Sequence, residues 1–125
     1  MNITEKIKSY EDACNALGLN PEDLPVVDML PEKDKSSIIS YYKLIVIIRA
    51  LNEGWEPDFY NIHERKYYNW LWVDSAGFVF VSSSNASSST AALLGSRLCF
   101  KNSNLARFAA EHFLELYKSY LLLIR

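Results

Sequence analysis

The chain has 125 residues, of which 50% are hydrophobic and 22% are charged. This is the composition of one ordinary globular domain and excludes a disordered chain. The 13 basic and 15 acidic residues give a formal charge of −2, which argues against duplex-DNA binding through general phosphate neutralisation. Cys14 and Cys99 lie far apart without a CxxC motif, so we expect no metal or cofactor and two buried thiols in a reducing compartment.

A short helix is predicted near the N-terminus. Ser9, followed by Glu11 and Asp12, is a capping pattern, and Gly18 supplies a left-handed exit. No apolar segment typical of a signal peptide precedes this helix, and the most apolar run, residues 44–48, is too short to span a bilayer. We therefore expect a cytoplasmic protein without contact to a membrane.

A second, longer helix is predicted to begin at Pro31 and to end before Gly54. Its polar residues Ser36, Ser40 and Lys43 form one narrow stripe, while apolar and aromatic residues occupy most of the circumference. This pattern indicates a central helix that is covered on most sides.

The following residues predict a three-stranded antiparallel meander. Residues 66–74 have the composition of a strand, residues 75–77 form a turn, and residues 78–83 return the chain as a hairpin partner. The serine-rich segment 82–90 is typical of a flexible loop, and residues 94–101 resume as a third strand.

A long helix is predicted from Leu105 towards Leu123, capped by Ser103 or Asn104. Its polar stripe consists of Arg107, Glu111, Glu115 and Lys118. We therefore predict one α+β domain over residues 1–125, with two N-terminal helices, the three-stranded meander, and this C-terminal helix packed on the sheet.

The middle of the chain holds a dense block of aromatic residues. Strand alternation places Tyr68, Trp70 and Trp72 on one face of the first strand and Tyr67 with Asn69 on the other. Because the helices are expected to cover one face, the remaining face is a core contact, a subunit contact or a binding surface. Candidate ligand- or partner-binding residues are Trp55, Tyr68, Trp70, Trp72, Arg97 and Lys101.

Our first functional hypothesis is a non-enzymatic binding or assembly module that self-associates or binds a protein partner. The alternative is a protein that stacks single-stranded nucleic acid or a small nucleotide on an aromatic sheet face. In that hypothesis Arg97 grips a phosphate, and Arg65, Lys66 and Lys101 supply further positive charge. Arg97 is also expected to share a strand face with Cys99.

A small hydrolase-like enzyme is the third hypothesis. It would use His63, Asp74 and Cys99, whose spacing matches no catalytic motif. No nucleophile elbow, phosphate-binding loop or dinucleotide fingerprint is present in the sequence, so an enzyme is not expected.

Four segments resemble a known family: residues 8–13, 53–57, 66–70 and 95–101. In these segments the chain is similar to small uncharacterised proteins of phages and prophages in Bacteroidales gut bacteria. Asn69 stands where proline is common in that family, which favours an uninterrupted strand here. The resemblance implies an origin rather than a mechanism: a virion component, or a host-takeover protein that binds another molecule.

Overall fold

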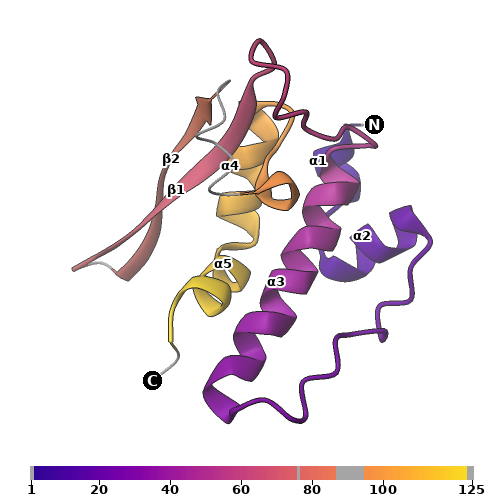
Figure 1. Cartoon of the computed structure of the whole chain (residues 1–125), viewed down its shortest axis with the longest axis vertical. Coiled ribbons are helices and arrows are strands. Elements are labelled where there is room, and N and C mark those ends of the chain that lie inside the picture. The colour runs from indigo at the N-terminus through magenta and orange to yellow at the C-terminus, as the bar shows by residue number, and fades with distance from the viewer. Residues whose placement is uncertain (1, 76, 87–94, 124–125) are drawn as a thin grey trace.

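The computed structural model describes residues 2–75, 77–86 and 95–123 and has an α+β fold (Figure 1). Its helices are α1 (Ile3–Lys6), α2 (Tyr10–Leu17), α3 (Glu32–Leu51), α4 (Ser103–His112) and α5 (Leu114–Leu121), with one 3-10 turn, η2 (Ser96–Leu98). The strands β1 (Lys66–Asp74) and β2 (Gly77–Ala86) form a two-stranded antiparallel sheet.

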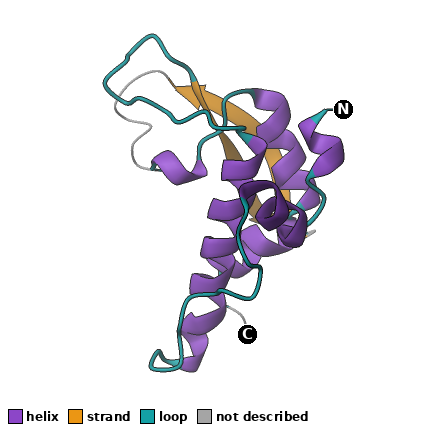
Figure 2. Cartoon of the chain, turned by 90° about the vertical axis from the view of Figure 1, so that its right-hand side faces the viewer, coloured by secondary structure: helices purple, strands orange, loops and turns teal. Residues whose placement is uncertain are grey.

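The elements lie in layers. The hairpin of β1 and β2 packs against α4, α5 packs against α3, and α3 packs against α2 on its other side (Figure 1). Seen from the side of α2, the helices lie in front of the strands (Figure 2). One face of the hairpin is therefore covered by helices.

The predicted N-terminal helix is confirmed as α2. The Ser9 side chain accepts a hydrogen bond from the Asp12 amide, and Gly18 ends the helix at a φ of 71°, in the left-handed region. A one-turn helix, α1, precedes it and is capped by Asn2. Three helices therefore precede the sheet rather than the expected two, because a four-residue helix is too short to show periodicity in a sequence.

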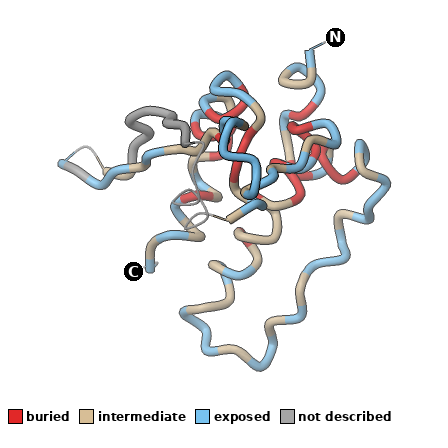
Figure 3. Tube along the Cα trace, turned by 45° about the horizontal axis from the view of Figure 1, so that its top comes forward, coloured by how far each residue is buried: buried red, intermediate tan, exposed pale blue. Residues whose placement is uncertain are grey.

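Helix α3 is the predicted central helix. In its second half, buried residues cover every side of the helix except the side of Ile45 and Arg49: Leu44, Val46, Ile47, Ile48, Ala50 and Leu51. Ser40, expected on a polar stripe, is also buried. The buried part of the chain is concentrated on this half of α3 and its neighbours (Figure 3).

The predicted hairpin is present. Strand β1 has the expected bounds, and β2 continues to Ala86, so the first part of the serine-rich segment is strand rather than loop. Residues 87–90 of that segment lie outside the described residues. The register shifts once, between Trp70 and Leu71. Such a bulge increases the local twist of the strand.

The expectation of a three-stranded meander is wrong. The region of the third strand forms η2 and then one isolated bridge, in which Tyr67 and Phe100 exchange two backbone hydrogen bonds of 3.1 and 2.8 Å. Leu94, the expected first residue of that strand, lies outside the described residues.

The pairing with β1 is short because η2 ends at Leu98 and the cap of α4 is already Asn102. The Asn52 amide donates to the Cys99 carbonyl at 2.9 Å and accepts from the Lys101 amide at 3.1 Å. One buried side chain therefore satisfies the Cys99 carbonyl and the Lys101 amide, which the single bridge to β1 leaves unpaired.

The predicted long C-terminal helix is divided in two at Phe113, which has a φ of −120° and a ψ of 30°. Its cap is Asn102, one residue before the expected Ser103, and accepts from the Leu105 amide at 2.9 Å. The break turns α5 towards α3, where the rings of Tyr41 and Tyr120 stack at 4.8 Å. Helix α4 makes the main contact with the strands, as expected, while α5 mainly packs against α3.

Among helices formed by the described residues, none combines the length and the hydropathy needed to cross a bilayer.

Candidate functional site

The outer face of β1 carries Tyr68, Trp70 and Trp72, and we call these three residues the open face. Trp70 is 50% exposed and Trp72 is 54% exposed, whereas Tyr67 and Leu71 on the other side of the strand pack against the core. On that inner side, the Asn69 amide also donates to the Tyr117 hydroxyl of α5 at 3.2 Å. The strand alternation predicted from the sequence is thus confirmed, and the face left uncovered is the one with the two indoles.

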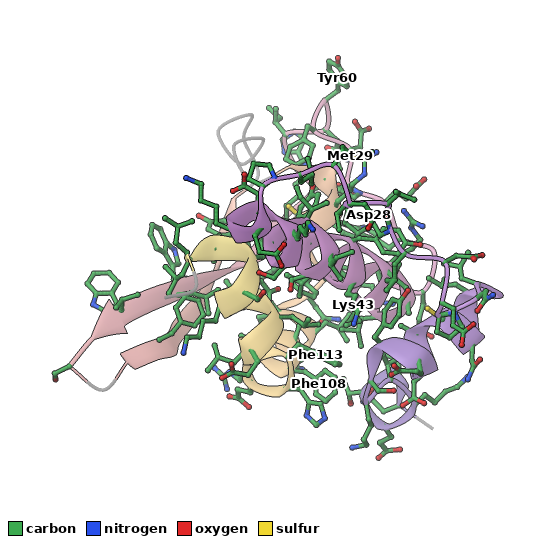
Figure 4. The ribbon with its side chains drawn as sticks, turned by 90° about the horizontal axis from the view of Figure 1, so that it is seen from below. Asp28, Met29, Lys43, Tyr60, Phe108 and Phe113 are labelled. Carbon is green, nitrogen blue, oxygen red and sulfur yellow. The ribbon has the colours of Figure 1, made fainter. Side chains whose placement is uncertain are left out.

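The hairpin projects beyond the helices, as the view from below shows (Figure 4). At this end Val73 is 59% exposed although it follows the inner row of β1. Both sides of the hairpin end are therefore accessible. The sequence predicts the rings of the open face, but it gives no signal for Val73, because the reach of α4 and α5 along the strands is a tertiary property.

The register gives each of two large rings on the open face a small cross-strand partner. Tyr68 pairs with Ser84, and Trp70 pairs with Ser82. The rings of Tyr68 and Trp70 lie 6.3 Å apart between centroids.

Trp55 and Arg97 lie together, away from the open face. They line a hollow of about 390 Å³ between the end of α3, the loop after it, and η2. Arg49, in the last turn of α3, lines the same hollow. We call this cavity, with Arg49, Trp55 and Arg97 in its lining, the arginine hollow. The sequence gives no signal for Arg49, because a basic residue in the last turn of a helix is commonly explained by the helix dipole.

The two guanidinium groups of the arginine hollow have no partner in the described part of the chain. Neither Arg49 nor Arg97 makes a hydrogen bond or an ion pair with its side chain there. Glu56 lines the same hollow but does not form an ion pair with either arginine. The expectation that Arg97 shares a strand face with Cys99 is wrong, because η2 exposes Arg97 while Cys99 is buried.

The cations expected beside the open face serve other contacts. Lys101 lies 3.3 Å from the Glu53 carboxylate and lines a separate hollow beside α1. Lys66, at the start of β1, is fully buried. The single basic patch considered from the sequence is therefore not assembled at the open face.

Lys66 holds the loop that precedes β1. Its ammonium donates to the carbonyls of Asn61 and Glu64 at 2.9 and 3.0 Å, and it lies 3.5 Å from the Glu64 carboxylate. The same carboxylate accepts from the Asp58 amide at 2.7 Å, and the Phe59 ring lies 5.3 Å from the ammonium. A buried charge is tolerated only with such a set of partners.

The residues of the enzyme hypothesis do not form a catalytic pair in the described part of the chain. Burial raises the pKa of the Cys99 thiol to about 11, and its Sγ donates to the Gly95 carbonyl at 3.3 Å. Cys99 is therefore a neutral thiol at neutral pH. His63 is exposed in the loop after α3, and the side chain of Asp74 lies outside the description.

Comparison with protein-family models, with curated proteins and with solved structures gives no match for this chain.

Proposed function

We propose that this protein is a non-enzymatic assembly module that binds a second copy of itself through the open face of its hairpin. The observation that carries the proposal is the half exposure of Trp70 and Trp72 on one face of a sheet whose other face is covered by helices. Large apolar residues left together in water on a small domain mark an interaction surface.

A second copy fits this face better than a charged partner does. Apart from Lys66 and Asp74 at its two ends, β1 has no charged residue, and β2 has none. Two such hairpins can approach without repulsion between like charges. A two-fold axis would bring the open face of one copy against the same face of the other.

The energy balance depends on the indoles. Two half-exposed tryptophans leave on the order of 200 Å² of apolar surface in water for each copy. Burying this surface on both copies, roughly 400 Å² at about 25 cal/mol per Å², contributes about 10 kcal/mol. The loss of free tumbling opposes association by roughly 4–15 kcal/mol, so removal of the indoles should abolish the dimer.

Stacking of single-stranded nucleic acid on the open face is the less favoured hypothesis. Such platforms combine rings with a positively charged groove. Here Lys66 is used inside the protein, Lys101 lies beside Glu53, and Arg97 lines the arginine hollow, which no open-face residue lines.

The resemblance to phage and prophage proteins extends the proposal to a place of action. We propose that the assembly forms in the cytoplasm of a bacterial host, either as part of a virion or as a complex that binds a host protein.

The test compares three proteins by light scattering over a range of concentrations. The wild type should show a mass that rises towards twice that of the monomer, and the double variant Trp70→Ser/Trp72→Ser should stay monomeric. Tyr60→Ser is the matched control, because Tyr60 is 99% exposed at the end of a loop away from the hairpin (Figure 4). This control should associate like the wild type.

Circular dichroism should show that the double variant remains folded, since its substituted rings lie outside the core. A wild-type protein that stays monomeric at the highest concentration would overturn the proposal. A folded double variant that still dimerises would overturn the assignment of the contact to the open face.

A further inference from the structure

We propose that the arginine hollow binds a small anion whose phosphate or carboxylate group is attached to a flat ring bearing N–H donors, such as a mononucleotide. This inference does not rest on self-association, because Tyr68, Trp70 and Trp72 do not line the hollow. Its volume of about 390 Å³ is that of a small-molecule site.

The two arginines are the evidence that the ligand is an anion. Arg49 comes from α3 and Arg97 from η2, segments far apart in the sequence, and both line one hollow without an internal acidic partner in the described residues. The helix dipole accounts for a basic residue such as Arg49 in the last turn of α3. It does not account for the second unpaired arginine, Arg97, which lies in η2. Guanidinium groups match the planar geometry of carboxylate and phosphate oxygens.

Trp55 and Glu56 are the evidence that the ligand contains a flat ring with N–H donors. Trp55 is partly buried and lines the same hollow as the two arginines, so its indole offers a flat aromatic surface to a bound ring. Two arginines and one glutamate leave a local charge of +1 (2 − 1), which suits a ligand with one anionic group. The Glu56 carboxylate can accept hydrogen bonds only, so it favours a ring that carries N–H donors.

The framework of the hollow is fixed by Asn52. Its amide nitrogen and oxygen are both used, on the Cys99 carbonyl and the Lys101 amide. Asn52 therefore fastens the end of α3 to the segment that follows η2. The hollow exists before a ligand arrives, which lowers the ordering cost of binding.

Calorimetric titration at low salt tests the inference with four probes. Adenosine 5′-monophosphate and 4-aminobenzoate carry the anion and the ring, adenosine carries only the ring, and inorganic phosphate carries only the anion. At least one of the first two should bind, and more tightly than the last two. If only the nucleotide binds, the anionic group that the site recognises is a phosphate. If only the benzoate binds, that group is a carboxylate.

Variants locate the binding. Arg49→Gln and Arg97→Gln should each weaken it about ten- to hundred-fold, because each removes a charge-assisted contact. Trp55→Leu should weaken it at least about five-fold through lost stacking. Arg107→Gln, on the exposed side of α4, is the matched control and should bind like the wild type.

The double variant Trp70→Phe/Trp72→Phe leaves Trp55 as the only tryptophan, so its fluorescence should change on saturation by the bound probe. Trp70→Ser/Trp72→Ser should bind as the wild type does, which separates this site from self-association. Absence of binding by both ring-bearing anions at millimolar concentration overturns the inference. Equal affinity in Arg97→Gln and wild type also overturns it.

Discussion

At the scale of single residues, Lys66 is the charged side chain that the fold buries most completely in the described part of the chain. Its sequence context, Arg65-Lys66, suggests a basic surface patch. The structure instead uses its ammonium to hold the carbonyls of Asn61 and Glu64. A sequence cannot show this, because the carbonyls become neighbours only after the loop has closed.

Replacing Lys66 with Met should keep most of the buried stem but leave the two carbonyls and the Glu64 carboxylate without their donor. We expect a loss of about 2–3 kcal/mol in the free energy of unfolding, measured by urea denaturation. Lys118→Met, at an exposed position of α5, is the control and should change it by no more than about 0.5 kcal/mol. Equal stability of the two variants would refute the internal role of Lys66.

The raised pKa of the Cys99 thiol predicts that the free energy of unfolding depends on pH. Burial raises its pKa from the usual 9.0 to about 11, so between these values the unfolded chain has lost the thiol proton while the folded chain keeps it. This contribution is therefore complete below pH 9 and is lost as pH rises towards 11, by at most about 1.4 kcal/mol per pH unit.

The measurement is urea unfolding of wild type and Cys99→Ala at pH 8, 9 and 10. The variant should lose less stability over this range than the wild type. A decline will remain, because burial also raises the pKa of Tyr117 and Tyr120. Identical declines in the two proteins would contradict the assignment to Cys99.

At the scale of elements, the sequence predicts structure well where local signals suffice. Residues 66–74 alternate between two faces and form β1 with the expected bounds, and Ser9 and Gly18 mark the ends of α2. The expected third strand does not form because η2 and the cap of α4 leave only a short extended segment, which pairs with β1 at the one bridge of Tyr67 and Phe100. The division at Phe113 also depends on tertiary contacts, since it directs α5 onto α3.

The same limit applies to the candidate site. From the sequence, the chemistry of their side chains makes Trp70, Trp72, Trp55 and Arg97 candidate binding residues. The sequence does not show that Trp55 and Arg97 line the arginine hollow while Trp70 and Trp72 lie on the open face. It also does not show that Arg49 lies beside Trp55. Tertiary packing brings together the side chains from α3, the following loop and η2. A single sequence does not reveal this packing.

The cap of α4 gives a prediction at this scale, because α4 is the helix that covers both strands. Asn102→Ala removes the acceptor of the Leu105 amide and should lower the free energy of unfolding by about 1 kcal/mol. Asn104→Ala, two residues later at an exposed position, is the matched control. Thermal unfolding followed by circular dichroism compares them, and equal melting temperatures for the two variants would contradict the role of the cap.

At the scale of the whole molecule, the helices bury one side of the hairpin and leave the other in water. A two-stranded sheet has little stability of its own, and here α4 supports it from the inner side. The open face is thus supported by the domain from its inner side without being part of the core. This arrangement suits a contact surface, because a second copy finds the rings already in place.

The most direct measurement of self-association uses Trp55→Phe, which leaves Trp70 and Trp72 as the only tryptophans. Their fluorescence, recorded with a soluble quencher while the protein concentration is raised, reports on the open face alone. Association through this face predicts that the emission shifts to shorter wavelength and that quenching weakens over the concentrations at which the mass doubles. Emission that stays long in wavelength and fully quenchable while the mass doubles, or a mass that never doubles, would contradict it.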